Sequence, residues 1–182
     1  MRGVATEAEF LPVELEFRDG RRVTVRAVRP QDKEDVQAFL KRLSEQSRYS
    51  RFMSTLRELS PKMLERAVNP EQGRELQLVA ICGEGAGRTI VGGARYSAAA
   101  GSKDCEFALT VDDAWQGFGL ARRLLEALIG AARAAGFERM EGHILASNAR
   151  MLGLAGRLGF ERVESPEEPT VRLVRRDLSR PG

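Results

Sequence analysis

The segment DDAWQGFGLARRLL, residues 112–125, places two glycines directly before an apolar run with helical spacing. The first turn of a helix has backbone N–H groups without intrahelical partners and carries the positive end of the helix dipole, so it attracts phosphate. Gly117 and Gly119 would let this backbone approach a ligand closely, because neither has a Cβ atom. The segment therefore predicts a binding loop for a molecule that carries a pyrophosphate.

The glycine pattern of this loop is incomplete when it is compared with the best-known phosphate-binding loops. It lacks the full GxGxxG of dinucleotide folds and the lysine of nucleoside-triphosphate loops. The same two glycines could instead serve only to shape a tight turn between a strand and a helix. Taken in isolation, the segment leaves both interpretations open.

One carboxylate lies a strand length upstream of the loop. In KDCEFALTV, residues 103–111, every second side chain from Cys105 to Val111 is apolar, which is typical of a strand with one buried face. The opposite face carries small side chains and Glu106. Glu106 is thus a candidate for acid–base chemistry, and the alternative is a solvated glutamate at the start of a strand.

The remaining reactive side chains favour structural roles. Cys82 and Cys105 form no CxxC pair and lie in apolar, strand-like runs, so we expect buried, reduced thiols. His143 is the only histidine of the chain and lies in the strand pattern RMEGHILA, which favours a structural role over a catalytic one. With so few ligands, no metal site is expected.

The predicted elements around these residues alternate between strands and helices. Ser60 is expected to cap a helix that has Pro61 at its first position, and Gly136 is expected to end the helix that follows the loop. Strands are predicted at 13–17, 22–28, 75–82, 88–97, 103–111, 139–146 and 170–178, and helices at 31–43, in two short pieces within 44–68, at 119–135 and at 148–158. This order indicates a mixed sheet with helices on both faces.

The composition fits one globular domain over residues 1–182, with residues 1–11 as a flexible tail. Apolar residues make up 42% and charged residues 30%. No apolar run is long enough to span a membrane, and the N-terminus lacks the apolar core of a signal peptide, so we expect a cytoplasmic protein without a membrane partner.

The net charge of +3 is carried largely by arginine, which suits an anionic ligand. No basic face interleaved with aromatic residues is evident, so a nucleic-acid partner is not expected.

Three stretches together resemble the GNAT acetyltransferases. QGFGLA, residues 116–121, resembles the family's Q/R-x-x-G-x-G/A signature, and EFALTV, residues 106–111, resembles its central strand. SNARMLGLAGRLGF, residues 147–160, resembles its second signature, in which an asparagine opens a helix that ends on LGF. In addition, EQSRYSRFMSTLRELSPKML, residues 45–64, resembles the GNAT domain of bacterial Pat-type protein lysine acetyltransferases.

The resemblance implies the GNAT fold: a mixed α/β (α+β) domain whose twisted mixed sheet has six to seven strands and about four flanking helices. The central strand would splay from its neighbour at a bulge, and acetyl-CoA would lie in the gap. Arg122 and Arg123 could both neutralise phosphate oxygens, and both could equally be solvated arginines on the helix face. The residues implied in holding acetyl-CoA are Leu109, Thr110, Val111, Gln116, Gly117, Phe118, Gly119, Leu120, Ala121, Arg122 and Asn148.

The implied reaction is direct transfer of an acetyl group from acetyl-CoA to an amine in a ternary complex. An amine attacks a thioester only when it is neutral, whereas a lysine ammonium has a pKa of about 10.4. Such a site needs a base, and Glu106 matches the general base of the Pat-type EFA segment. We expect Glu106 to be partly buried beside apolar groups.

The general acid is harder to assign. Many GNAT enzymes have a tyrosine five residues before the phenylalanine of LGF, and this chain has Ala155 there. Tyr49 and Tyr96 are substitutes that the sequence alone does not place, and a thiolate could also leave unassisted. Asn148 could hold the pantetheine arm, or it could simply cap its helix.

The acceptor amine is also open. The Pat-type segment favours a protein lysine, and a small-molecule amine is the nearest rival. A binding module that senses acetyl-CoA without transferring its acetyl group is the alternative outside enzymes. The sequence is compatible with a homodimer and does not determine the oligomeric state.

Overall fold

Eight strands form one sheet in a computed structural model that describes residues 9–54, 56–164 and 168–179. Their spatial order is β1-β2-β3-β4-β5-β6-β8-β7, and every neighbouring pair is antiparallel except β5 and β6. The strands are β1 (Val13–Glu16), β2 (Arg22–Ala27), β3 (Glu75–Cys82), β4 (Thr89–Ser97), β5 (Asp104–Val111), β6 (Arg139–Leu145), β7 (Glu161–Val163) and β8 (Val171–Asp177).

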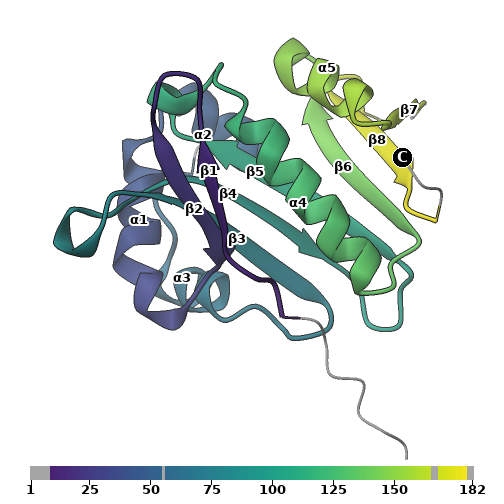
Figure 1. Ribbon diagram of the computed structural model, residues 1–182. Helices are drawn as coiled ribbons and strands as arrows, with labels where there is room; N and C mark the ends of the chain where they lie inside the picture. The colour runs from purple at the N-terminus through teal and green to yellow at the C-terminus, as the bar shows by residue number, and fades with distance from the viewer. Residues whose placement is uncertain (1–8, 55, 165–167, 180–182) are drawn as a thin grey trace, which may run out of the picture.

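Five α-helices cover this sheet on two sides (Figure 1). They are α1 (Lys33–Arg42), α2 (Glu45–Phe52), α3 (Pro61–Val68), α4 (Leu120–Ala134) and α5 (Ala149–Arg157), with short 3-10 turns at Pro30–Asp32, Gly85–Gly87 and Asp113–Trp115. Apolar residues of α1 and α3 form one core with β3 and β4, whereas α4 and α5 share a second core with the opposite face of the sheet.

The mixed α/β fold class is confirmed, and the details differ in the number of elements. The sheet has eight strands rather than six to seven, because the three-residue β7 is too short to show a period of two. The described part of the chain has five α-helices rather than about four.

Ser60 caps α3 as expected, since its Oγ accepts a hydrogen bond from the Met63 N–H. Residues 1–8 of the expected tail lie outside the described residues, and residues 9–12 form no helix or strand.

The sheet opens between its two parallel strands. β5 pairs with β6 only from Asp104–Arg139 to Phe107–Gly142. Beyond that point β5 continues along β4 as far as Val111, while β6 continues along β8 (Figure 1). The expected splay at the central strand is therefore present.

A bulge does not cause this splay. The pairing of β5 with β4 is regular from Glu106 to Val111, and the register shift lies instead between β3 and β4, at Ala80 and Ile81. Gly142 lies where β5 and β6 part, and a Cβ atom there would come within 2.3 Å of the Phe107 ring. The aromatic side chain thus occupies the space that a side chain on β6 would need.

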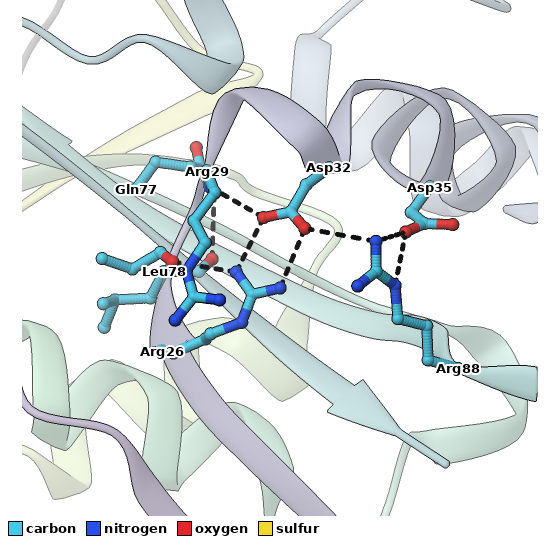
Figure 2. Close-up of polar contacts among 8 residues, drawn as sticks. Arg26, Arg29, Asp32, Asp35, Gln77, Leu78 and Arg88 are labelled. Carbon is cyan, nitrogen blue, oxygen red and sulfur yellow. Dashed lines mark hydrogen bonds and ion pairs between the residues drawn. The ribbon is translucent and has the colours of Figure 1, made fainter. Parts of the chain in front are cut away.

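A buried ion pair connects the start of α1 to β2 (Figure 2). The Arg26 guanidinium donates hydrogen bonds of 2.7 and 2.8 Å to the two carboxylate oxygens of Asp32, which also accepts one from the Arg29 N–H. Burial alone would raise the pKa of Asp32, but these hydrogen bonds and the charges of Arg26 and Arg88 hold it below its usual value. The pair fixes the turn that leads from the hairpin into the helical segment.

No helix within the described residues is long and apolar enough to cross a lipid bilayer.

Candidate active site

A cleft of about 1560 Å³ lies where β5 and β6 diverge. Its walls come from α2, from β5 between Glu106 and Val111, from the end of β6 and from the first turn of α5. Every residue of β5 from Glu106 to Val111 lines the cleft, and the face that carries Glu106, Ala108 and Thr110 is the more exposed of the two.

The predicted pyrophosphate loop borders this cleft through Gln116 and Ala121, the residues on either side of its glycines. Gly117 and Gly119 have φ angles of 83° and 90°, and nothing lies within 4 Å of the position where a Cβ atom would be on either one. The first hydrogen bond of α4 runs from the Arg123 N–H to the Gly119 carbonyl, and within the described residues no amide from Gly117 to Arg122 donates one. These amides form the row of free donors that an anion at a helix N-terminus requires.

The loop is held from both sides. Phe118 is 45% exposed, and the Arg21 guanidinium lies 3.7 Å from the centre of its ring. Leu120, in contrast, is fully buried in the core of α4. The side chains of these two residues therefore help to position the loop, and their backbone amides remain unpaired within the described part of the chain.

Serines at the start of α2 fix the other side of the loop. The Asp113 carboxylate accepts hydrogen bonds from the Ser44 N–H, the Ser44 hydroxyl and the Ser47 hydroxyl. Burial alone would raise the pKa of Asp113, but these hydrogen bonds keep it below its usual value. Gln116 donates to the Ser47 hydroxyl and to the Val111 carbonyl, each at 3.2 Å. Gln116 thus borders the cleft while its amide braces the loop against α2.

The arginines near the loop already make contacts with other side chains of the protein. Arg122 donates a 2.9 Å hydrogen bond to Glu126, and Arg123 lies 3.9 Å from the same carboxylate. Arg150, which sequence reasoning missed, extends from α5 across the cleft to the Gln116 side-chain oxygen at 3.4 Å. No local pattern marks Arg150, because its place beside the loop depends on how α5 packs.

The β5 residues predicted to hold the cofactor lie along the splayed part of the strand. Leu109, Thr110 and Val111 pair with Ala94, Gly93 and Gly92 of β4 along one edge. Their other edge has no strand partner among the described residues, because β6 has already turned away. That edge borders the cleft and can pair with an extended amide-containing ligand.

Asn148 caps α5. Its side-chain oxygen accepts a 3.1 Å hydrogen bond from the Met151 N–H, so the capping role that the sequence allowed is present. Asn148 also borders the cleft, together with Ala121 at the start of α4. Among the described residues, the hydrogen bond that its side chain makes is the one that caps the helix.

Glu106 lies in the cleft, in the half of β5 away from the phosphate loop. Its side chain is 57% exposed, so the expected partial burial beside apolar groups is wrong. One carboxylate oxygen lies 3.3 Å from Nδ1 of His143 on β6. His143 therefore also borders the cleft. The structural role that the sequence favours for it stays a prediction.

A positive charge also lies in the field of Glu106. Arg51 of α2 is half-buried, and its guanidinium lies 4.7 Å from the ring of Phe52. Burial lowers the pKa of Arg51 to about 10, with a contribution from Arg95, while the carboxylate of Glu106 acts in the opposite direction. Sequence reasoning missed Arg51, although it belongs to the SRYSRF segment that resembles the Pat-type domain.

The two tyrosines are clearly distinguished. Tyr49 lies on α2, borders the cleft and is 46% exposed, whereas Tyr96 is a buried core residue packed edge-on against Phe137. Ala155 is fully buried and does not line the cleft, whereas its neighbour Leu154 does. Tyr49 is thus the tyrosine placed to meet a ligand.

The cysteines and acidic groups offer no further reactive cluster. Cys105 is buried, which raises its pKa to about 12, and Cys82 is half-buried rather than buried as expected. Across the described ranges, no three His, Cys, Asp or Glu side chains are grouped as metal ligands would be.

Comparison with known proteins agrees with this geometry. The family model described as acetyltransferase (GNAT) domain matches residues 22–161. The chain is 35% identical, over 152 residues, to a Pseudomonas aeruginosa protein named as an acetyltransferase, covering 84% of this chain and 82% of that one.

Solved structures give the same picture. The GNAT domain of S. lividans PAT has a TM-score of 0.81 at 27% identity, covering 91% of this chain and 96% of that one. A cAMP-binding acyltransferase from Mycobacterium smegmatis has a TM-score of 0.63 at 26% identity, covering 92% of this chain and 47% of that longer one. A Salmonella typhimurium protein solved with its cofactor acetyl-CoA has a TM-score of 0.68 at 21% identity, covering 86% of this chain and 94% of that one. On the strength of the family model and the curated relative, this chain belongs to the GNAT acetyltransferase family.

Proposed function

We propose that this protein transfers an acetyl group from acetyl-CoA to a primary amine, by direct attack of the amine in a ternary complex. The observation that carries the proposal is a single cleft with two chemically different ends. One end has the unpaired amides of residues 117–122, and the other has the carboxylate of Glu106. An acyl donor with a pyrophosphate and a reactive thioester needs both ends.

The residues at the phosphate end fit the cofactor. The free amides from Gly117 to Arg122 suit the pyrophosphate, and Arg150 adds a cation across the cleft. The open edge of β5 from Leu109 to Val111 suits the two amide groups of a pantetheine arm. Bound acetyl-CoA supplies the thioester that the amine attacks.

Glu106 acts as the general base in this proposal. Its carboxylate takes the proton from the acceptor ammonium, directly or through one water, so that the amine nitrogen has a free electron pair. Its exposure leaves room for an acceptor that reaches in from solvent. The guanidinium of Arg51 adds a positive charge in the field of this carboxylate.

The proposed acceptor is a protein lysine. Support comes from α2, which borders the cleft and carries the sequence that resembles Pat-type domains, and from the likeness to the GNAT domain of the S. lividans PAT. A lysine side chain is long and flexible, and the exposed cleft beside Glu106 is accessible to it.

Incubation with radiolabelled acetyl-CoA tests this proposal. The acceptors are lysate proteins, poly-L-lysine and a panel of free amines, with Glu106→Gln as the matched inactive control. Label on lysine side chains of proteins is expected. Label on free amines alone would make the enzyme a small-molecule acetyltransferase, and binding of acetyl-CoA without transfer to any acceptor would make it a sensor module.

A further inference from the structure

His143 and Glu106 are brought together by the register of two parallel strands. Glu106 on β5 lies opposite Glu141 on β6, and His143 follows two residues later on the same face of the sheet. The Nδ1 atom of His143 lies 3.3 Å from a carboxylate oxygen of Glu106. Both side chains border the cleft, and they are 44% and 57% exposed.

The position of His143 in β6 differs from that of a histidine that only supports the fold. It follows Gly142, the last residue of β6 that pairs with β5, so its side chain enters the opening between the strands. Its backbone is still held, because it pairs with Leu173 of β8. Glu106 is the only described side chain within hydrogen-bond distance of its ring.

The other charged groups near Glu106 are poor proton acceptors. Arg51 of α2 is a cation, and so is Arg95 of β4, which lies 3.4 Å from Glu75. Glu141 on β6 is engaged by Arg175 of β8, whose Nε donates a 2.7 Å hydrogen bond. His143 is therefore the group beside Glu106 whose ring can accept a proton at one nitrogen and donate one from the other.

We propose that His143 is a proton relay for Glu106 during acetyl transfer. Glu106 takes one proton from the acceptor ammonium, and the protonated carboxyl passes that proton to Nδ1 of neutral His143. The imidazolium then releases its other ring proton, from Nε2, to water at its exposed side. Glu106 is then back in its starting state, and one proton has moved from the amine to solvent. His143 is left as the other neutral tautomer, with its proton on Nδ1, and uptake of a proton from water at Nε2 followed by loss of the Nδ1 proton to water restores the starting tautomer. The relay depends on the proposed function.

This role predicts a specific dependence of turnover on pH. A protonated imidazole cannot accept a proton from Glu106, and histidines ordinarily change charge near pH 6.5. Turnover should therefore rise through this range as the imidazole becomes neutral. A histidine that served only to hold Glu106 in place would not make turnover rise with pH in this range.

The test compares the wild-type enzyme with His143→Asn and His143→Ala, using radiolabelled acetyl-CoA and poly-L-lysine between pH 5.5 and 9. Asparagine keeps a polar group at the place of Nδ1 without titrating. We expect His143→Asn to lower kcat about tenfold at pH 7 and to lose the acid limb near pH 6.5, with the affinity for acetyl-CoA unchanged. Imidazole added to His143→Ala should restore part of the lost turnover.

The outcomes separate the relay from the proposed function. A wild-type enzyme that binds acetyl-CoA in calorimetry but acetylates no amine would overturn the proposed function and the relay with it. Active wild type, together with a His143→Asn variant of equal kcat and equal pH profile, would overturn the relay alone. Loss of activity without rescue by imidazole would also contradict the relay if circular dichroism shows that His143→Ala is folded.

Discussion

Four of the polar side chains that line the cleft come from three elements that are distant in sequence. Tyr49 and Arg51 face it from α2, Glu106 from β5 and His143 from β6. β5 and β6 carry buried apolar side chains as well, whereas α2 contributes only the partly buried Phe52 to the core. Glu106 and His143 are thus positioned by the packing of their strands.

Tyr49 is the residue whose removal tests how the thiolate leaves. Because the usual tyrosine position is Ala155, a proton for the leaving sulfur would come from Tyr49 or from water. Tyr49→Phe should lower kcat about tenfold or more if the phenol is the donor. Tyr96→Phe, in the core, is the matched control and should leave kcat unchanged. Equal kcat for Tyr49→Phe and wild type would assign the proton to water.

Asp32 contributes to the stability of the fold rather than to catalysis. Its carboxylate is buried against Arg26, so Asp32→Ala should lower the free energy of unfolding by about 3–5 kcal/mol, because it leaves the guanidinium buried without its partner. Asp35→Ala, at a more exposed ion pair with Arg88, should cost about 1 kcal/mol or less. Urea unfolding of both variants measures the difference.

The same ion pair predicts a dependence of stability on pH. Since the pKa of Asp32 is lower in the folded than in the unfolded chain, its contribution is complete above the unfolded value of about 3.9. It is lost as the pH falls through the folded pKa, where the native carboxylate also takes up a proton. The wild type should therefore lose more stability than Asp32→Ala on acidification below about pH 4.

At the scale of elements, α4 joins a buried stripe to an open N-terminus. Leu120, Leu124 and Leu128 are fully buried, so the helix is fixed in the second core while its first amides remain unpaired. This combination keeps the amides aligned before any ligand arrives, which lowers the cost of binding an anion.

Gly119→Ala tests this arrangement. The residue is left-handed, with a φ angle of 90°, and an alanine there is strained by about 1–2 kcal/mol although the space is open. Relief of that strain would misalign the amides, so the Kd for acetyl-CoA should rise about tenfold. Gly136→Ala, at the other end of α4 with a φ angle of 88° and equally open space, should destabilise the fold by a similar amount without changing the Kd. Calorimetry distinguishes the two variants.

The elements themselves could be predicted from local patterns, and their contacts could not. Helical spacing and caps indicated α1, α3 and α4, and alternation indicated the face of β5 that carries Glu106. The burial of Glu106 was predicted wrongly and the proximity of His143 to it was not predicted, because both depend on where β5 and β6 part. Arg51 and Arg150 lie on helices whose packing brings them to the cleft, and no local pattern reports such packing.

At the scale of the whole molecule, the site lies where one sheet divides between two partners. β5 remains with β4, β6 remains with β8, and the ends of α4 and α5 flank the opening (Figure 1). The resemblance in sequence predicted this opening, although not its cause, since the pairing along β5 is regular. A cleft built from backbone edges and a helix N-terminus suits a long cofactor with amides and phosphates.

The turnover of Glu106→Gln, measured at saturating acetyl-CoA with the Kd for acetyl-CoA determined in parallel by calorimetry, tests the central claim most directly. Glu161→Gln, at an exposed carboxylate of β7, is the matched control. The account predicts a kcat lower by about 100-fold or more for Glu106→Gln, with an unchanged Kd and with wild-type kcat for the control. A Glu106→Gln enzyme that turns over at the wild-type rate would contradict it.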